Sequence, residues 1–148
     1  MQIYPDKFSA MVTKSLTPKV GVGVILRNPE GKILLLLRKN SHGARLWSLP
    51  GGHMELGETF LNTCKREVLE ETEVTIIGIR HICFANHIFE DEKLHYVTLF
   101  FEAVWDMTQN IINAEPDKCE CFRWFEPKEF EFIPNMFESL PQVIKDNL

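Results

Sequence analysis

The sequence of 148 residues contains no long apolar run and no recognisable export signal. Its longest uninterrupted apolar stretch is residues 33–37, whereas a helix that crosses a bilayer needs about 20 apolar residues. No positively charged segment followed by an apolar one opens the chain, as a secretory leader would. We therefore expect a cytoplasmic protein that does not bind a membrane.

Cysteine is scarce, with 4 residues in the whole chain. Disulfides are not expected in a protein that carries no export signal. Cys119 and Cys121 are separated by one residue, whereas zinc-binding pairs are usually separated by two, and no second pair accompanies them. We interpret them as alternate positions on a strand, with reduced thiols.

An excess of positive charge is also lacking, since 16 Lys and Arg stand against 21 Asp and Glu, for a net charge of -5. A broad nucleic-acid-binding surface needs clustered Lys and Arg, so polymeric nucleic acid is not an expected partner. Free nucleotides stay open as ligands, because they need only a local positive patch. The length and the apolar content of 45% predict a single domain, residues 1–148, with a substantial core.

What the chain does contain is a segment, residues 59–72, without Gly or Pro, which predicts a helix of about four turns. On a helical wheel one arc of this segment holds the apolar residues Phe60, Leu61, Cys64 and Val68. Glu67 and Glu71 fall on or inside the edge of that arc, and Glu70 lies beside Glu67. An ordinary amphipathic helix keeps charged residues away from its apolar face.

Glu67 and Glu71 are four residues apart, a spacing at which like charges destabilise even an exposed helix. Two carboxylates about 5 Å apart repel by about 3 kcal/mol at an effective dielectric constant of about 20. A divalent cation would remove this repulsion, because carboxylate oxygens are its preferred ligands. A solvated acidic face is the other interpretation, and the wheel alone leaves both open.

The wider spacing extends this helix into a longer pattern, Gly-x5-Glu-x7-Arg-Glu-U-x-Glu-Glu-x-Gly-U, in which U is a bulky apolar residue. The residues that fit it are Gly52, Glu58, Arg66, Glu67, Val68, Glu70, Glu71 and Val74. The pattern resembles the signature of the Nudix hydrolases. One position departs, because Glu73 stands where the signature has its last glycine, and Glu tolerates a left-handed backbone poorly.

The resemblance extends beyond this signature. Residues 46–53, 95–98 and 115–120, together with Trp124, look like the eukaryotic MutT-type branch of the family, which cleaves nucleoside triphosphates. The resemblance implies the Nudix fold, in which a mixed β-sheet is sandwiched between α-helices.

The apolar pattern gives the same class independently. It predicts strands at residues 19–27, 32–39, 75–81, 84–89 and 94–105, and a second helix at residues 135–146. The first two strands are expected to pair as a hairpin. Pro141 inside the second helix predicts a kink or a late start. Strands that alternate with helices in this way are typical of α/β or α+β layers.

Family chemistry is an implication of the resemblance. Nudix enzymes hydrolyse a nucleoside diphosphate linked to another group, and a nucleoside triphosphate yields the monophosphate and pyrophosphate. Mg²⁺ or Mn²⁺ neutralises the phosphates and activates water. Carried over by position, Glu67 and Glu71 are the main metal ligands and Glu70 is an added ligand or base. Glu58 would assist through a second metal or a bound water, and Arg66 would orient the carboxylates.

Further residues are candidates for substrate contacts. Arg38 ends a predicted strand and could bind a phosphate, for which its guanidinium offers two parallel donors. Gly51 lies in a glycine turn where a backbone carbonyl could complete a metal's coordination shell. By the same family similarity, the residues near the base would be Ser48, Leu49, Thr98 and Phe137.

Some polar residues keep a structural interpretation at this point. Glu115 and Glu120 could each approach a metal, although a solvated loop is the expectation for both. His53 and the other histidines have no partner at catalytic or ligand spacing, so we assign them no role.

Three hypotheses for the function follow. The first is a Mg²⁺-dependent nucleoside triphosphate pyrophosphohydrolase that acts on oxidised or noncanonical purine nucleotides. The second is a Nudix hydrolase of ADP-ribose, a nucleotide sugar or a dinucleotide. The third is a non-catalytic nucleotide sensor, which the intact set of Glu67, Glu70 and Glu71 argues against. The resemblance also implies a homodimer.

Overall fold

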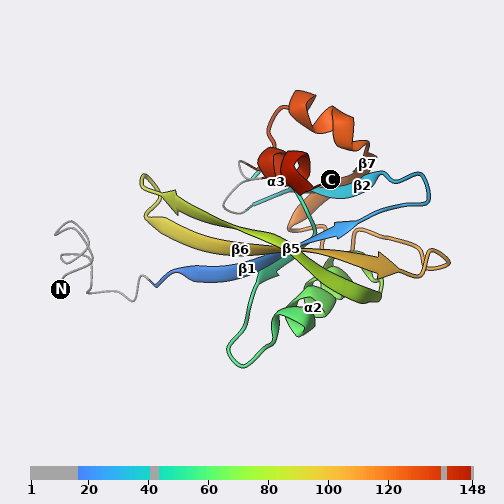
Figure 1. Ribbon diagram of the computed structural model, residues 1–148, viewed down its shortest axis with the longest axis horizontal. Coiled ribbons are helices and arrows are strands. Elements are labelled where there is room, and N and C mark those ends of the chain that lie inside the picture. Colours follow the sequence, from blue (N-terminus) through green and yellow to red (C-terminus); the bar gives the residue numbers. More distant parts are fainter. Residues whose placement is uncertain (1–16, 41–43, 138–139, 148) are drawn as a thin grey trace.

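The computed structural model describes residues 17–40, 44–137 and 140–147. The strands are β1 (Lys19–Leu26), β2 (Ile33–Arg38), β3 (Trp47–Ser48), β4 (Gly51–His53), β5 (Ile76–Phe89), β6 (Leu94–Trp105) and β7 (Cys119–Phe125). The helices are α2 (Phe60–Thr72), the 3-10 helix η1 (Pro127–Phe132) and α3 (Leu140–Asn147). Figure 1 shows α2 on one side of the strands, with η1 and α3 on the other. None of the helices in these ranges is both long and apolar enough to cross a membrane.

The strands form two sheets. The first has the order β4-β1-β6-β5 and is mixed, because β1 runs parallel to β6 while the other pairs are antiparallel. The second sheet is antiparallel and has the order β3-β2-β7. The predicted α/β class with a mixed sheet is confirmed, and the second sheet is an addition to the prediction.

The predicted hairpin of the first two strands is wrong. Strands β1 and β2 lie in different sheets, and the connection between them is closed by the bridge of Arg27 with Ile33. The physical reason is that both edges of β1 are already paired, one with β4 and the other with β6. Strand β2 therefore pairs with β7, which the sequence order did not indicate.

The two faces of the first sheet bury two apolar clusters, and β1 contributes to both because successive side chains of a strand point to opposite faces. Val22 and Val24 pack with Val68 of α2 and Phe101 of β6. Ile25 lies on the other face, in the cluster that reaches the second sheet, η1 and α3. This double burial explains why the β1 sequence is continuously apolar.

Helix α2 follows the predicted segment closely. Thr59 caps its first turn by accepting a hydrogen bond from the Asn62 N–H at 3.2 Å. At the other end Glu73 adopts the left-handed conformation, with φ 58°, and its N–H donates to Leu69. The expectation that Glu73 occupies a position suited to glycine is therefore confirmed. The buried stripe is narrower than the predicted arc, because Phe60 and Leu61 in the first turn stay exposed.

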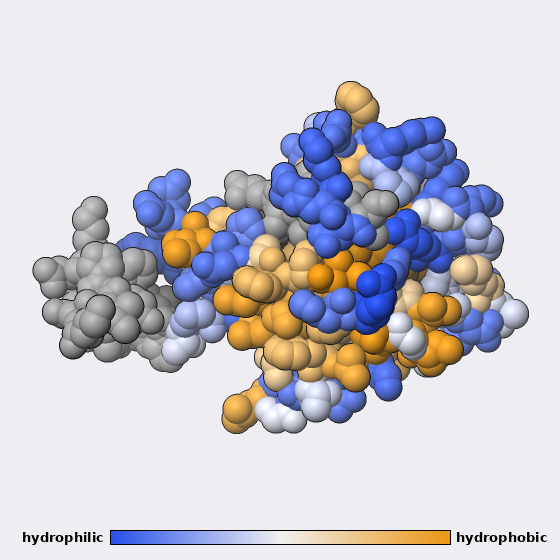
Figure 2. Space-filling model, in the orientation of Figure 1, coloured by the Kyte–Doolittle hydropathy of each residue, from blue (hydrophilic) through white to orange (hydrophobic). Residues whose placement is uncertain are grey.

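The two strands predicted at residues 75–81 and 84–89 are one continuous strand, β5. Its register with β6 shifts between Ile77 and Arg80 and again between His81 and Cys83, so the side-chain alternation breaks there. Strand β5 lies at the edge of the first sheet, and its Phe84 is 68% exposed. In Figure 2 apolar side chains gather across the middle of this face of the molecule.

Helix α3 begins at Leu140, five residues later than predicted from the pattern that starts at residue 135. Pro141 lies in its first turn, where a missing backbone N–H costs no helical hydrogen bond. Of the two outcomes that the proline predicted, the structure has the late start.

Candidate active site

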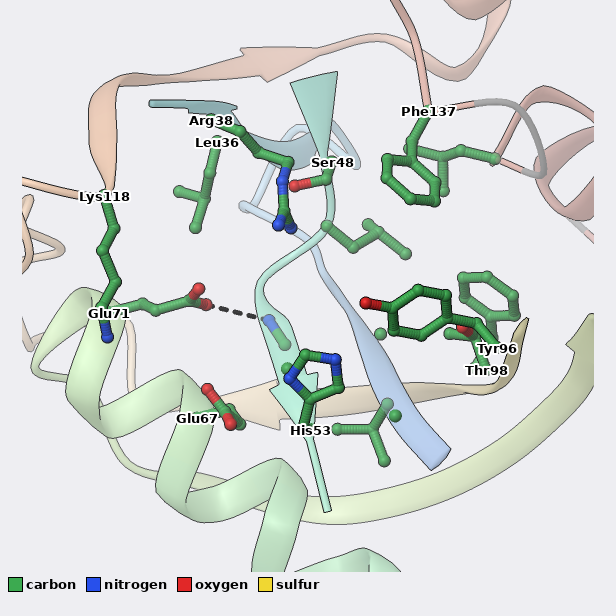
Figure 3. Close-up of a pocket in the computed structure, with 18 of the residues that line it drawn as sticks. Leu36, Arg38, Ser48, His53, Glu67, Glu71, Tyr96, Thr98, Lys118 and Phe137 are labelled. Carbon is green, nitrogen blue, oxygen red and sulfur yellow. Dashed lines mark hydrogen bonds between the residues drawn. The ribbon is translucent and has the colours of Figure 1, made fainter. Parts of the chain in front are cut away.

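A cavity of about 500 Å³ opens between α2, β4 and the ends of β1, β2 and β6. One end of it is acidic and includes Glu67, Glu70, Glu71 and Glu115, and Glu55 also lines the cavity. The other end is largely aromatic, with Phe89, Tyr96, Phe100 and Phe137. Figure 3 shows Arg38 reaching into the space between the two ends. The cavity thus has an acidic region and an aromatic region.

Glu71 has the most deeply buried carboxyl of the acidic end. Burial raises the pKa of Glu71 to about 8, and the negative charges of Glu67 and Glu115 add to the rise. The Gly51 N–H donates to Glu71 Oε2 at 2.9 Å, and this hydrogen bond partly offsets the rise in pKa. A carboxyl with this pKa is poised to exchange its proton for a metal ion near neutral pH.

Glu67 lies one helical turn before Glu71 and faces the same cavity. Its side chain is 13% exposed, and burial raises its pKa although the Arg66 guanidinium bonds to it at 2.9 Å. Gly52 lies against this carboxyl, because a Cβ atom built on Gly52 would be 2.5 Å from Glu67 Oε1. The glycine of the signature therefore makes room for the acid.

Arg66 forms ion pairs with three carboxylates, those of Glu58, Glu67 and Glu70. Its Nε donates to Glu58 Oε1 at 2.7 Å and its Nη2 to Glu58 Oε2 at 2.9 Å, a bidentate pair. Its Nη1 contacts Glu67 at 2.9 Å and Glu70 at 3.2 Å, and its Nη2 also donates to the His53 carbonyl. Hydrogen bonds from Arg66 lower the pKa of Glu58 to about 2.

Glu58 itself does not line the cavity, although it was a candidate for metal or water contact. Its two oxygens are occupied by Arg66, and Oε2 also accepts from the Thr63 hydroxyl and the Glu55 N–H. Glu58 is connected to the acidic end only indirectly, because Arg66 bonds both Glu58 and the carboxylates of Glu67 and Glu70. Its predicted assistance to a second metal stays a prediction.

Glu115 joins the acidic end from the loop before β7. The loop is tied to the last turn of α2 by backbone hydrogen bonds, from Ala114 N to Glu71 O at 3.1 Å and from Ile112 N to Thr72 O at 3.2 Å. Of the two loop acids considered from the sequence, Glu115 lines the cavity, whereas Glu120 is exposed and lies outside it. The Lys118 amine pairs with Glu115 Oε1 at 2.7 Å.

The acidic end suits a divalent cation by the chemistry of its donors, which are carboxylates crowded in a partly desolvated space. Within the described ranges, no three acidic, His or Cys side chains already lie close enough together to form a preformed metal site. The carboxylates are instead turned to protein partners: Glu67 and Glu70 to Arg66, and Glu71 to the Gly51 N–H. Gly51, the candidate carbonyl ligand, thus also orients Glu71.

Arg38 lies between the acidic and the aromatic ends. Its guanidinium carbon is 5.8 Å from the centre of the Phe137 ring, and after burial and Lys19 its positive charge is a third cause that lowers the pKa of His53. A phosphate chain that joins a metal at the acidic end to a base at the aromatic end would pass this side chain. This position is consistent with the predicted phosphate contact.

The four residues expected near a base all line the cavity. They are Ser48, Leu49, Thr98 and Phe137. Gly23 on the floor cannot carry a side chain without a shift, because a Cβ atom there would lie 3.0 Å from Phe100. The structure brings these residues together, while their contact with a base stays a prediction.

Sequence reasoning assigned no role to His53 or Tyr96, yet both line the cavity. Their rings stack with centres 5.5 Å apart and an angle of 22° between planes. The pKa of His53 is lowered by burial and by the charges of Lys19 and Arg38, which favours the neutral imidazole. A usable signal was the position of His53 directly after the glycine turn, whereas the signal for Tyr96 was the family resemblance of residues 95–98.

Comparison with known proteins gives a consistent result. A family model described as NUDIX domain matches residues 17–146. The NAD-capped RNA hydrolase NudC of Pectobacterium carotovorum is 32% identical over 131 residues, which cover 88% of this chain and 48% of NudC. The chain therefore spans about half the length of this relative.

Solved structures share the fold. The MutT NUDIX hydrolase from Burkholderia pseudomallei has a TM-score of 0.78 and 26% identity, with 87% of this chain and 97% of that one covered. The NUDIX domain of Shewanella oneidensis NrtR, solved with ADP ribose, has a TM-score of 0.68 and 19% identity, with 97% and 98% covered. At that lower identity the likeness is one of fold alone.

Proposed function

The chain belongs to the Nudix hydrolase family, and from this premise we propose that it cleaves a nucleoside triphosphate to the monophosphate and pyrophosphate with the help of Mg²⁺ or Mn²⁺. The observation that carries the proposal is the continuity of one cavity, from the buried carboxyls of Glu67 and Glu71 past Arg38 to an aromatic end. A nucleotide has the same order of parts: charged phosphates, then sugar and base. The likeness to the MutT hydrolase of Burkholderia pseudomallei supports this class of substrate.

In the proposed mechanism each residue acts on charge or orientation. Glu67, Glu71 and Glu115 would hold the ion, which neutralises the phosphates and activates the attacking water. Arg66 holds Glu67 and Glu70 in place through the bonds described above. Glu70 is the most exposed of these acids, with 47% of its side chain accessible, and it would serve as an added ligand or as the base that takes a proton from water.

The aromatic end suits a nucleobase, and a purine is the base that we propose. Phe89, Tyr96, Phe100 and Phe137 line this end, and stacking on aromatic side chains is available to every base. The hydroxyls of Ser48 and Thr98 both line the cavity, and each could bond the edge of an oxidised or otherwise noncanonical purine. Hydroxyls both donate and accept, which suits a base with altered edge groups.

A screen for pyrophosphate release tests the proposal. The panel contains dGTP, dATP, 8-oxo-dGTP, ADP-ribose, NADH and a nucleotide sugar, each with Mg²⁺ and with EDTA. We expect metal-dependent pyrophosphate release from one or more triphosphates. Turnover of the diphosphate-linked compounds alone would overturn this substrate class.

Hydrolysis of a dinucleotide is the second candidate. It is favoured by the identity to NudC, whose name as an NAD-capped RNA hydrolase places a dinucleotide in its substrate. The net charge of -5 argues against the polymeric RNA part of such a substrate. Release of AMP from NADH or ADP-ribose, without pyrophosphate release from triphosphates, would establish this alternative. Tight nucleotide binding without any turnover would instead indicate a sensor.

A homodimer is part of the proposal. Strand β5 is the last strand at one edge of the first sheet; its Phe84 and Ile88 are exposed, and Arg80 is its one charged residue apart from histidines. Two copies of such an edge would not repel each other. Sedimentation equilibrium, compared between the wild-type chain and Phe84→Lys, tests it: we expect a dimer that the substitution dissociates, and a wild-type monomer would overturn it.

A further inference from the structure

Lys118 places an ammonium group at the acidic end of the cavity. Its Nζ is 2.7 Å from Glu115 Oε1. The bond to Glu115 raises the pKa of Lys118, and the charges of Glu67 and Glu70 raise it further. The amine therefore lies within the field of three of the acids that would hold a metal ion. Figure 3 shows its side chain extending from the loop toward α2 beside Glu71.

The backbone of Lys118 is held by two hydrogen bonds, whereas its ammonium is held by the hydrogen-bonded ion pair with Glu115. Its N–H donates to the Glu115 carbonyl at 2.9 Å, and its carbonyl accepts from the Lys39 N–H at 2.7 Å. The side chain itself is 72% exposed. Exposed ion pairs contribute little to stability, so the ammonium can leave Glu115 at low cost while its stem stays anchored.

Arg66 is the contrasting cation of the acidic end. Its side chain is 23% exposed, and it bonds Glu58, Glu67 and Glu70 at once. Moving it would break three ion pairs at once and leave the half-buried Glu58 carboxylate without its positive partner. A divalent ion that binds beside Glu115 and Glu67 competes with Lys118 and Arg66 for these carboxylates. Of the two, Lys118 can be displaced at lower cost.

Resting on the proposed metal-dependent hydrolysis, we propose that Lys118 is an exchangeable counter-ion of the acidic end. Before a divalent ion binds, the ammonium of Lys118 holds Glu115 and offsets part of the negative charge. When the ion binds, it takes over Glu115, and the released ammonium moves to a phosphate oxygen of the substrate. The flexible stem and compact charge of lysine suit such an exchange better than the planar arginine group.

This role predicts opposite effects on two kinds of binding. Without Lys118 a divalent ion has no competitor for Glu115, so it binds more tightly in the absence of nucleotide. The substrate loses one phosphate contact, so it binds more weakly. A lysine that merely supported the loop would weaken both.

The test is titration of Mn²⁺ into nucleotide-free protein, followed by electron paramagnetic resonance, for the wild type and Lys118→Met. We expect the Kd for Mn²⁺ to fall about threefold in the variant, which is the effect that an exposed ion pair supports. The KM for dGTP should rise about tenfold, with a smaller change in kcat, as expected for a lost phosphate contact. Lys118→Arg should restore most of the KM.

The matched control is Lys39→Met, because Lys39 is also an exposed lysine at this rim but its Nζ bonds the Pro116 carbonyl and it lies outside the cavity. It should leave both constants unchanged. An unchanged or weaker Mn²⁺ affinity in Lys118→Met would overturn the role of Lys118, provided that Glu71→Gln loses Mn²⁺ binding in the same assay. Undiminished Mn²⁺ binding by Glu71→Gln would overturn the metal site itself and this proposal with it.

Discussion

The carboxyl of Glu67, on α2, lies directly against Gly52, on β4. A Cβ atom on Gly52 would lie 2.5 Å from the Glu67 carboxyl carbon, well inside van der Waals contact. The obstacle would be the end of a side chain rather than a backbone, so the acid can swing away without unfolding the protein. The glycine of the signature thus has a steric cause: it permits the carboxyl to lie against the turn.

Gly52→Ala is therefore expected to displace Glu67 and lower kcat by about tenfold to a hundredfold while the fold stays intact. Mn²⁺ affinity should fall in parallel. The comparison that isolates the cause is a double-mutant cycle with Glu67→Gln. If the alanine acts through Glu67, it should cost much less activity once Glu67 is already replaced. Fully additive losses would show that Gly52 acts in some other way.

Glu67→Gln and Glu71→Gln are each expected to cut turnover by orders of magnitude and to weaken metal binding, since each removes a ligand charge at nearly constant shape. Far-ultraviolet circular dichroism should stay unchanged. Glu120→Gln is the matched control, because Glu120 is an exposed acid on β7 that lies outside the cavity. Wild-type activity in either of the first two variants would refute their assignment.

The candidate site was largely predictable because three of its acids, Glu67, Glu70 and Glu71, are encoded by spacing within one helix, whereas Glu115 comes from a loop. Glu67 and Glu71 are four residues apart, so helical geometry alone brings them to one face. Thr98 and Phe137 are distant in the sequence, and their proximity to the acids was accessible through the family resemblance alone. Lys118 and Tyr96 enter the cavity through strand and loop placement, which local patterns do not encode.

The fold was predictable in its elements and less so in its pairing. Local periodicity located α2 and the strands, but it could not show that β1 runs parallel to β6. That pairing depends on contacts between residues about 75 positions apart, such as Arg27 with Glu102. The prediction divided β5 into two strands for a local reason. Register shifts around Arg80 and Cys83 interrupt the alternation of side chains on which that prediction relied.

Glu73→Gly should retain activity and stabilise the protein by about 0.5–1 kcal/mol. Glu73 has a φ of 58°, a conformation that costs a residue with a side chain more than it costs glycine, although glycine loses more entropy on folding. Urea unfolding at equilibrium measures the change. Glu73→Ala is the control, because alanine keeps the strain and should show no such gain. A large loss of activity in Glu73→Gly would reveal a role for this acid that its geometry does not suggest.

Glu71 should make the metal-free protein less stable as the pH rises. Burial raises the pKa of Glu71 from 4.5 to about 8, so the folded state keeps a proton that the unfolded state has already released. Below about pH 4.5 the Glu71 carboxyl is protonated in both the folded and the unfolded state, so its raised pKa does not lower the free energy of unfolding. Between about pH 5 and 8 the folded state binds more protons, so the free energy of unfolding falls by up to about 1.4 kcal/mol per pH unit.

The contribution of Glu71 is isolated by the difference between the wild type and Glu71→Gln, both in EDTA. We expect the variant to lack the decline that Glu71 causes, so the gap in Tm between the two proteins should widen from pH 5 to pH 8. Added Mg²⁺ should stabilise the wild type most at high pH, where the carboxylate is free to bind it, and should do little for the variant. A constant gap in EDTA would show that Glu71 ionises normally and that its carboxyl is better solvated than the cavity implies.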